Sequence, residues 1–525
     1  MKVETNRTVL AIAFFSSVLV AVCAISSGSL WIDEFGTWLL TRADSISDWL
    51  IRFQSGPDSD SQIPLYHFYM YGWTKLVGTG AVAMRASNIG MFVIATLALV
   101  WPFRSRPNIA VSVIFTSCLN ASIWYYLNEI RPYIMLYMGT CLMVGASIEV
   151  LGAKQKPSSF AITALCLGAV ISSGATVIGI AWAASVFLFI LIYWLAIRKR
   201  SLSEVVNGNY LTLAIAALCI IALIAHYIRM FALGRLPALL GEDNILTLLF
   251  SFYANLGLLG VGPGMLDMRA NGVGALVPFA TIIAFSAIMF GLAAIGGLFE
   301  IRAIVGVRTL GLLIICILLP ALFIFVLGLV VHWRALPRHF IPLISIFSLL
   351  YAFGLAWWWH RRFVGVAVTL ISIILIGYSA LSVRYAPRHA KDDYKHAAEL
   401  AETELARGGR VWWIAEIRGA LYYRVPVKTA SFLSTQPPPT LVLLSKPDTY
   451  DRQHVVRNYL LANKYRLFES FPAFTAWRQQ NPVLLELSSS RELEPGTHTR
   501  LAETDYNPHL VLASVIGAGL GLDLR

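Results

Sequence analysis

Long apolar segments separated by short polar turns run through most of this 525-residue chain. Helices of about 20 such residues cross the hydrocarbon core of a bilayer. Eleven segments are candidates: 8–27, 82–103, 109–124, 132–151, 159–173, 176–197, 210–228, 276–298, 310–331, 340–358 and 364–382. A twelfth, 246–261, contains several glycines and ends in Gly-Pro-Gly, which fits a short span or a re-entrant segment. The pattern predicts a polytopic α-helical membrane protein.

Compact basic turns indicate the topology, because lysine and arginine concentrate in cytoplasmic loops. These turns contain Arg104 and Arg106, Lys154 and Lys156, 198–200, Arg302 and Arg308, and Arg361 and Arg362. All five lie on one side only if 246–261 does not cross. We therefore expect about 11 spans, a cytoplasmic N-terminus and a long external loop over residues 28–80. The expected location is a bacterial inner membrane, with the C-terminal region outside the cytoplasm.

Beyond about Arg384 the composition changes to that of a small soluble domain. Helical periodicity covers 392–407, with Asp392 as its expected N-cap, and a second helix is expected over 452–461. Residues 410–414 and 440–444 look like short buried strands, so an α/β domain is predicted. The expected organisation is a membrane domain over 1–383, a soluble domain over 384–490 and a C-terminal tail of uncertain order over 491–525.

Composition supports the membrane interpretation and narrows the function. Apolar residues make up 57% of the chain, charged residues make up 13%, and the mean hydropathy is +0.68. The net charge of +12 arises mainly before residue 385, where 24 Lys and Arg face 14 Asp and Glu. That excess belongs to membrane turns, and no basic stripe with interleaved aromatics indicates nucleic acid. Membrane lipids are therefore expected partners, whereas nucleic acid is not.

An acidic pair, Asp33 and Glu34, follows the first apolar segment and is flanked by Trp31 and Trp38. Carboxylates near hydrocarbon are costly, so such a pair at the boundary is a candidate functional site. Taken alone, the pair is better explained as two solvated loop acids.

Three further polar clusters are expected at the same outer membrane face. Glu129 and Arg131 lie in the turn 128–133, and Arg338 and His339 lie in the turn 333–339. Each cluster also fits an ordinary role, as a charge pair that caps a turn or as a contact with lipid headgroups. The convergence of carboxylates and guanidinium groups on one face is more informative than any single motif.

The third of these clusters runs from Asp60 to His67 and is followed by Arg85. We expect Pro64, Tyr66, His67 and Arg85 to support the external loop. Asp58 and Asp60 in this loop have a spacing that could bind a divalent cation, but we interpret them as solvated loop acids. No metal site is predicted, and no cofactor is implied.

At this point the chain resembles the GT-C superfamily of integral-membrane glycosyltransferases, specifically glycosyltransferase family 39. That group includes protein O-mannosyltransferases, lipid A aminoarabinose transferases and rhizobial core galacturonosyltransferases. The resemblance covers roughly residues 8–400, and the order of its short motifs carries it. The motifs are residues 31–34, 63–66, 83–87, 128–133, 337–340 and 391–394.

The resemblance implies that a sugar is transferred from a polyprenyl-phosphate carrier to an acceptor at the extracytoplasmic face. By this analogy Asp33 is the acidic residue of the first external loop that takes part in catalysis. Two features differ from the group. The aminoarabinose transferases have a lysine near the position of Gln62 and Ile63, and a doubled proline is here the single Pro64.

The chemistry is consistent with these residues, because a polyprenyl phosphate departs without a general acid. Only a base for the acceptor hydroxyl is needed, and Asp33 can supply it. Arg131, Arg338 and His339 are the candidates for binding the donor phosphate. Glu34 or Glu129 would orient the acceptor or tune Asp33. We predict a single displacement with inversion.

Other functions remain open at this stage. A transporter or flippase for a lipid-linked sugar would have charged residues near mid-membrane and repeat-like halves. An O-antigen-type ligase or polymerase would lack the early acidic loop. A non-catalytic envelope assembly protein would tolerate neutralisation of the acids. Neither the sugar nor the acceptor, which could be a lipid, a glycan or a protein, is predicted.

Overall fold

The computed structural model describes residues 2–55, 59–153, 156–234, 244–426 and 438–479. The chain divides into two compact units. The first comprises residues 1–26 and 40–389, and the second comprises residues 27–39 and 390–525. Residues 27–39 therefore belong with the C-terminal part of the chain, although in sequence they follow the first long helix.

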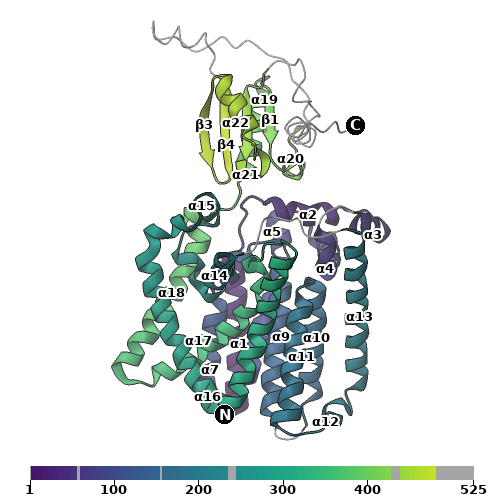
Figure 1. Ribbon diagram of the computed structural model, residues 1–525, viewed down its shortest axis with the longest axis vertical. Helices are drawn as coiled ribbons and strands as arrows, with labels where there is room; N and C mark the ends of the chain where they lie inside the picture. The colour runs from purple at the N-terminus through teal and green to yellow at the C-terminus, as the bar shows by residue number, and fades with distance from the viewer. Residues whose placement is uncertain (1, 56–58, 154–155, 235–243, 427–437, 480–525) are drawn as a thin grey trace. The chain divides into compact units, whose positions relative to one another are not determined.

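Long helices running side by side form the first unit (Figure 1). They are α1 (Lys2–Ala24), α6 (Ser87–Val100), α7 (Pro107–Cys118), α9 (Tyr133–Gly152), α10 (Ser159–Ala175), α11 (Gly179–Ile192), α13 (Tyr210–Ala232), α16 (Ala280–Val330), α17 (Pro342–Trp359) and α18 (Arg362–Tyr385). Shorter helices connect them: α3 (Ile46–Ser55), α4 (Pro64–Val77), α5 (Ala81–Arg85), α8 (Ala121–Leu127), α12 (Ser203–Val206), α14 (Ile245–Tyr253) and α15 (Met265–Asn271). Eight short 3₁₀ or π-helical segments complete the unit: η1 (Ser59–Gln62), η2 (Trp101–Phe103), η3 (Tyr193–Ile197), η4 (Ala254–Leu258), η5 (Leu259–Val261), η6 (Gly272–Phe279), η7 (Pro337–Phe340) and η8 (Pro387–His389).

The predicted class, a polytopic helical membrane protein, is confirmed. Among the described residues, eight helices are long and apolar enough to cross a membrane, or nine if the pair α7 and α8, bent by 54°, is one span. Helix α16 has 51 residues and a non-helical break at Gly306, where φ is +79°. At 1.5 Å per residue it extends about 77 Å, which is enough for two crossings. Together with the shorter α10, all eleven predicted segments are helical.

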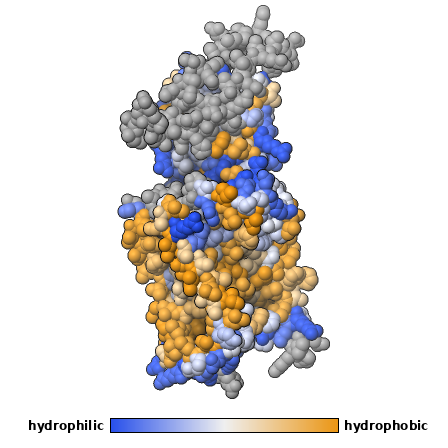
Figure 2. Space-filling view, turned by 90° about the vertical axis from the view of Figure 1, so that its right-hand side faces the viewer, coloured by the Kyte–Doolittle hydropathy of each residue, from blue (hydrophilic) through white to orange (hydrophobic). Residues whose placement is uncertain are grey.

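Apolar side chains cover the surface of the helical unit between its hydrophilic ends (Figure 2). Helix α13 shows this best, since only 11% of its most apolar window is buried. In water this exposure would be strongly unfavourable, whereas lipid accepts it directly. The chain is therefore an integral membrane protein.

The segment 245–261 forms α14, η4 and η5, with a sharp change of direction at Gly257, where φ is +92°. Its first part contacts η7, and its last part contacts η8, where Arg388 donates to the carbonyls of Gly260 and Gly262 at 2.9 and 3.0 Å. Turn η7 precedes α17 and η8 follows α18, so both turns lie at the same end of this antiparallel helix pair. The segment consequently enters and leaves at one end, as a re-entrant segment does.

The second unit contains a four-stranded mixed sheet with strand order β1-β2-β4-β3. Strands β1 (Val411–Ile414) and β2 (Leu441–Ser445) are parallel, and Val411 is paired with Leu441. Strand β4 (Phe474–Gln479) runs antiparallel to β2 and to β3 (Tyr465–Phe471). Its helices are α19 (Tyr394–Ala406), α20 (Ile417–Tyr422), α21 (Pro447–Tyr450) and α22 (Val455–Ala462), and α2 (Ile32–Thr41) belongs to it through Leu39.

The predicted small α/β domain is confirmed, with one local correction. Asp393, not Asp392, caps α19, because its carboxylate accepts the backbone N–H of His396 at 3.0 Å. Asp392 instead forms a buried ion pair with Lys446. The predicted tail over 491–525 lies outside the described residues.

Candidate functional site

Helix α2 begins with the acidic pair, and its two carboxylates have different surroundings. Glu34 is fully buried, and its Oε2 accepts the backbone N–H of Trp31 at 3.0 Å. This bond satisfies a backbone donor at the start of the helix, where negative charge is also favoured by the helix dipole. Asp33 is only half-buried. Glu34 is therefore placed to hold the start of α2, whereas Asp33 keeps an exposed part for a reaction partner.

Aromatic packing fixes α2 within the second unit. The buried ring of Phe35 meets Tyr394 edge to face at 5.1 Å between centroids, and it lies 5.9 Å from Tyr422. Trp38, one turn further along, contacts Tyr422 at 5.2 Å. Such pairs add about 0.5–1.5 kcal/mol each beyond the burial of their area. The face of α2 that carries Phe35 and Trp38 is thus part of the core of the soluble domain.

Hydrogen bonds fix the segment that leads into α2. The backbone N–H of Leu30 donates to the Tyr423 hydroxyl at 3.1 Å, and this hydroxyl donates to the Ser29 hydroxyl at 3.3 Å. The backbone N–H of Lys395 also donates to Ser29, at 3.2 Å. Both ends of these bonds belong to the second unit, so the backbone before Asp33 is tied to the C-terminal domain.

The motif 391–394, one of those that carry the family resemblance, has a clear structural part in this arrangement. Asp392 pairs with Lys446, whose ammonium group lies 5.8 Å from the ring centre of Trp31. Asp393 caps α19, and Tyr394 packs against Phe35. This motif therefore helps to build the surface on which α2 rests.

In the first unit, Arg131 forms an ion pair with Asp60. The Arg131 Nη1 lies 2.8 Å from the Asp60 Oδ1, and the side chains are 11% and 13% exposed. His67 is the next group in this cluster, with its Nε2 3.7 Å from the same carboxylate oxygen. Three titratable groups thus meet here, from η1, from α4 and from the turn before α9. Asp60 and Arg131 are 71 residues apart in the sequence.

The protonation of this cluster follows from burial and charge. Burial alone would raise the pKa of Asp60, but Arg131 and His67 outweigh it and hold that pKa below the usual value. Burial lowers the pKa of His67, against the opposing effect of Asp60. Near neutral pH the cluster therefore consists of a carboxylate, a guanidinium group and a neutral imidazole.

Glu129 is buried in the turn between α8 and α9, and its neighbours are held by side-chain amides. The side-chain amide of Asn88 donates to the backbone carbonyl of Glu129 at 2.8 Å. The side-chain Oδ1 of Asn128 accepts the backbone N–H of Ser26 at 2.9 Å. The buried guanidinium of Arg85 donates to the Ser26 carbonyl at 2.9 Å. These bonds join the end of α1 to the turn that carries Glu129 and Arg131.

Arg338 and His339 lie in η7, near the same turn. The Tyr126 phenol interacts electrostatically with both Glu129 and Arg338, so these two charges lie at one end of the first unit. His339 accepts the backbone N–H of Leu336 on its Nδ1 at 2.9 Å, and burial, followed by the Arg338 charge, holds its pKa well below the usual value. In the described structure His339 is therefore neutral and shapes its turn.

The residues expected to support the loop lie in α4 and α5. Pro64 occupies the first turn of α4, where its missing N–H costs nothing. Tyr66 is fully buried, and the ring of His67 lies 6.2 Å from that of Phe53 on α3. The His226 Nε2 lies 2.9 Å from the Ser61 carbonyl, which joins η1 to α13.

The structure brings Glu129, Arg131, Arg338, His67 and Arg85 into the first unit, and it assigns Asp33 and Glu34 to the second. Sequence analysis missed one member of the first group. Asp60 was interpreted as a solvated loop acid, but it is the partner of Arg131. The only feature of the sequence that indicated a role for Asp60 was its position just before the motif 63–66. Across the described residues, no group of three or more His, Cys, Asp or Glu side chains is arranged to bind a metal ion.

Comparisons with known proteins give a structural likeness only. No protein-family model matches the chain, and no curated protein sequence matches it. Among solved structures, the chain is similar to the crystal structure of ArnT from Cupriavidus metallidurans bound to undecaprenyl phosphate. The identity is 12% and the TM-score is 0.48, and the match covers 89% of this chain and 97% of that one. At this degree of similarity the function has to be inferred from the side chains themselves.

Proposed function

We propose that this chain is a membrane glycosyltransferase that moves a sugar from a polyprenyl-phosphate carrier to an acceptor at the extracytoplasmic face. The main support is the charge arrangement at one end of the first unit, where Arg131 and Arg338 accompany the carboxylates of Asp60 and Glu129. With Arg85, which donates to the Ser26 carbonyl, three guanidinium groups and two carboxylates belong to this part of the first unit, an excess of positive charge that suits a phosphate. The family resemblance of the sequence supports the same reaction.

In the proposed reaction, an acceptor hydroxyl oxygen attacks the anomeric carbon while the bond from that carbon to the phosphate oxygen breaks. The hydroxyl proton passes to the carboxylate of Asp33, and the polyprenyl phosphate leaves with the bonding electron pair. Arg131 and Arg338 would stabilise the charge that develops on the phosphate. Proton transfer of this kind contributes roughly 10²–10⁴-fold to a rate. A single displacement inverts the anomeric configuration.

The test is transfer by the purified full-length protein from a panel of polyprenyl-phosphate sugars. Asp33→Asn should lower the transfer rate at least about 10²-fold, because the amide cannot accept the hydroxyl proton at this position. Asp48→Asn is the matched control. Asp48 lies in α3 of the same stretch of chain, where it is half-buried, as Asp33 is, and pairs with Arg52 at 2.9 Å.

Asp48→Asn should keep the wild-type rate. Transfer by Asp33→Asn at the wild-type rate would remove Asp33 from the mechanism, and retention of configuration in the product would exclude a single displacement. If no polyprenyl-phosphate sugar of the panel serves as a donor, although lipid-linked sugar crosses vesicles containing the protein, a flippase is the better description.

A further inference from the structure

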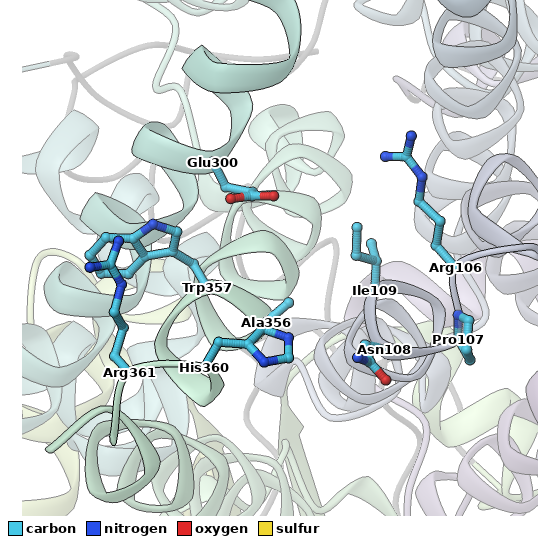
Figure 3. Close-up of a pocket in the computed structure, with 9 residues that line it drawn as sticks. All are labelled: Arg106, Pro107, Asn108, Ile109, Glu300, Ala356, Trp357, His360 and Arg361. Atoms are coloured by element: carbon cyan, nitrogen blue, oxygen red, sulfur yellow. The ribbon is translucent and has the colours of Figure 1, made fainter. Parts of the chain in front are cut away.

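A cavity of about 420 Å³ opens in the first unit, at the end opposite Arg131 and Arg338. It lies between the start of α7, the middle of α16 and the end of α17 (Figure 3). Helix α6 begins beside the Glu129 turn and ends before Arg106, and α17 begins after Arg338 and ends before His360. The cavity therefore lies at the end that the basic turns predict to be cytoplasmic.

Charges of both signs line this cavity. Glu300 and Arg106 face it from opposite sides, while His360 and Asn108 approach it from α17 and α7 (Figure 3). Within the described part of the chain, neither Glu300 nor Arg106 has an ion-pair partner, and Glu300 is half-buried. A partly buried charge without a partner is costly, so a ligand that supplies the opposite charge would be stabilised here.

A second cation is held in place at the rim. The Arg361 guanidinium stacks on the Trp357 ring at 4.1 Å from its centre, an arrangement that restricts its rotamers and keeps its hydrogen-bond donors available. Two guanidinium groups and one carboxylate therefore line one small cavity, and this combination matches a ligand that carries a phosphate and a separate cation.

The surface around the cavity is apolar and exposed. Phe363 and Val364 at the start of α18 are 86% and 66% exposed, and Phe299 beside Glu300 is 52% exposed. Val111 on α7 and Ile295 on α16 are exposed as well. Side chains of this kind face lipid tails. A ligand whose charged part fills the cavity and whose apolar part lies on this surface is a membrane lipid.

We propose that the cavity binds the headgroup of an aminophospholipid, a lipid whose headgroup joins a phosphate to a primary ammonium group. The phosphate would accept hydrogen bonds from Arg106, and the ammonium group would donate to the carboxylate of Glu300, which lies between Arg106 and Arg361 (Figure 3). An anionic headgroup with no cation would leave Glu300 unpaired beside a negative charge. This lipid site is independent of the proposed sugar transfer.

The experiment uses native mass spectrometry of the delipidated full-length protein with an equimolar mixture of phosphatidylethanolamine, phosphatidylcholine and phosphatidylglycerol. Wild type should retain phosphatidylethanolamine in preference to the other two, because phosphatidylcholine lacks N–H donors and phosphatidylglycerol lacks a cation. Glu300→Gln should lower retention of phosphatidylethanolamine about tenfold and remove the preference, since a hydrogen bond between charged groups is lost. Arg106→Gln should weaken retention of all three lipids.

Arg302→Gln is the matched control, because Arg302 is an exposed arginine close to Glu300 in sequence that does not line the cavity. It should leave the lipid preference unchanged. The proposal is overturned if wild type prefers phosphatidylglycerol, if Glu300→Gln keeps the wild-type ratio of lipids, or if Arg302→Gln lowers retention as much as Glu300→Gln.

Discussion

Asp33 and Glu34 are adjacent in the sequence, but burial separates their functions. Glu34 is fully buried and accepts the backbone N–H of Trp31, just before its own helix, so its carboxylate helps to hold the start of α2. Asp33 is half-buried and is the better candidate for accepting a proton. Asp60 has a third environment, since Arg131 holds its pKa below the usual value and keeps it charged. Acidic residues in one stretch of chain thus have three different tasks.

Three histidines of the first unit make its stability depend on pH. Burial lowers the pKa of His67, His339 and His389 in the folded protein. In the unfolded chain a histidine has a pKa of about 6.5, so the unfolded state binds more protons below that pH. The stabilising contribution is present above about pH 6.5 and is lost as the pH falls. We expect the thermal unfolding midpoint of wild type to drop between pH 7 and pH 5.

His339→Asn isolates one of these contributions. The Asn carbonyl can accept the Leu336 N–H that the His339 Nδ1 accepts, but it does not titrate in this range. The fall of the unfolding midpoint from pH 7 to pH 5 should be smaller in this variant, with a remainder from His67 and His389. Thermal scans at several pH values in one detergent measure it. An unchanged pH dependence would mean that folding does not lower the pKa of His339.

At the residue scale, sequence reasoning found most of the charged groups but not their pairing. Glu129 and Arg131 could be found because they interrupt an apolar pattern at the expected membrane boundary. The partnership of Asp60 with Arg131 spans 71 residues and leaves no local trace. The cap formed by Glu34 depends on a helix that begins at Ile32. This stretch was expected to be part of a loop, although Ile32, Phe35 and Trp38 have helical spacing.

Helix α2 is the element whose assignment changes most between sequence and structure. By sequence it belongs to a loop of the membrane domain, but its core residues Phe35 and Trp38 pack against Tyr394 and Tyr422 of the C-terminal domain. The candidate base is therefore carried by a helix that the soluble domain holds. The soluble domain thus contributes directly to the proposed chemistry, because it sets the conformation of the backbone on either side of Asp33.

Phe35→Ala should release α2 from this domain. Truncation of a buried phenylalanine costs about 3–5 kcal/mol, and here the loss falls on the contact between α2 and α19. Amide hydrogen exchange of residues 28–38 should become faster. Phe468→Ala is the control, since Phe468 on β3 is 49% exposed and lies under Arg478. If residues 28–38 exchange equally slowly in Phe35→Ala and in wild type, α2 is held by other contacts.

Elements were predictable from sequence where burial imposes a simple period. The eleven apolar segments are all helical, and β1 and β2 have the continuous apolar runs of buried strands. Strands β3 and β4 were not predicted. Of the seven side chains of β3, only that of Tyr465 is buried, so the sequence of this strand carries little hydrophobic signal. The sheet forms because β4 pairs with the buried β2 and provides an edge for β3.

At the scale of the whole molecule, the re-entrant segment decides the membrane topology. If residues 245–261 do not cross, the compact basic turns share one side and the number of spans is odd. The hydrogen bonds from Arg388 to Gly260 and Gly262 support this, because they hold the end of the segment at η8. At Gly260 a side chain would collide with the Ser379 carbonyl, so only glycine permits this approach. The packing of this short segment thus determines on which side of the membrane each later loop is predicted to lie.

Fusions of alkaline phosphatase test this topology, since the enzyme is active only outside the cytoplasm. A fusion after Arg200 should be inactive, because a cluster of three basic residues there marks a cytoplasmic turn. Fusions after Gly234 and after Gly264 should both be active, because only the re-entrant segment separates them. Activity after Gly234 combined with inactivity after Gly264 would show that residues 245–261 cross the membrane. In that case the basic turns after Gly264 would lie outside, against the charge rule. The orientation of α16 to α18 would be reversed, and Arg338 would lie on the cytoplasmic side.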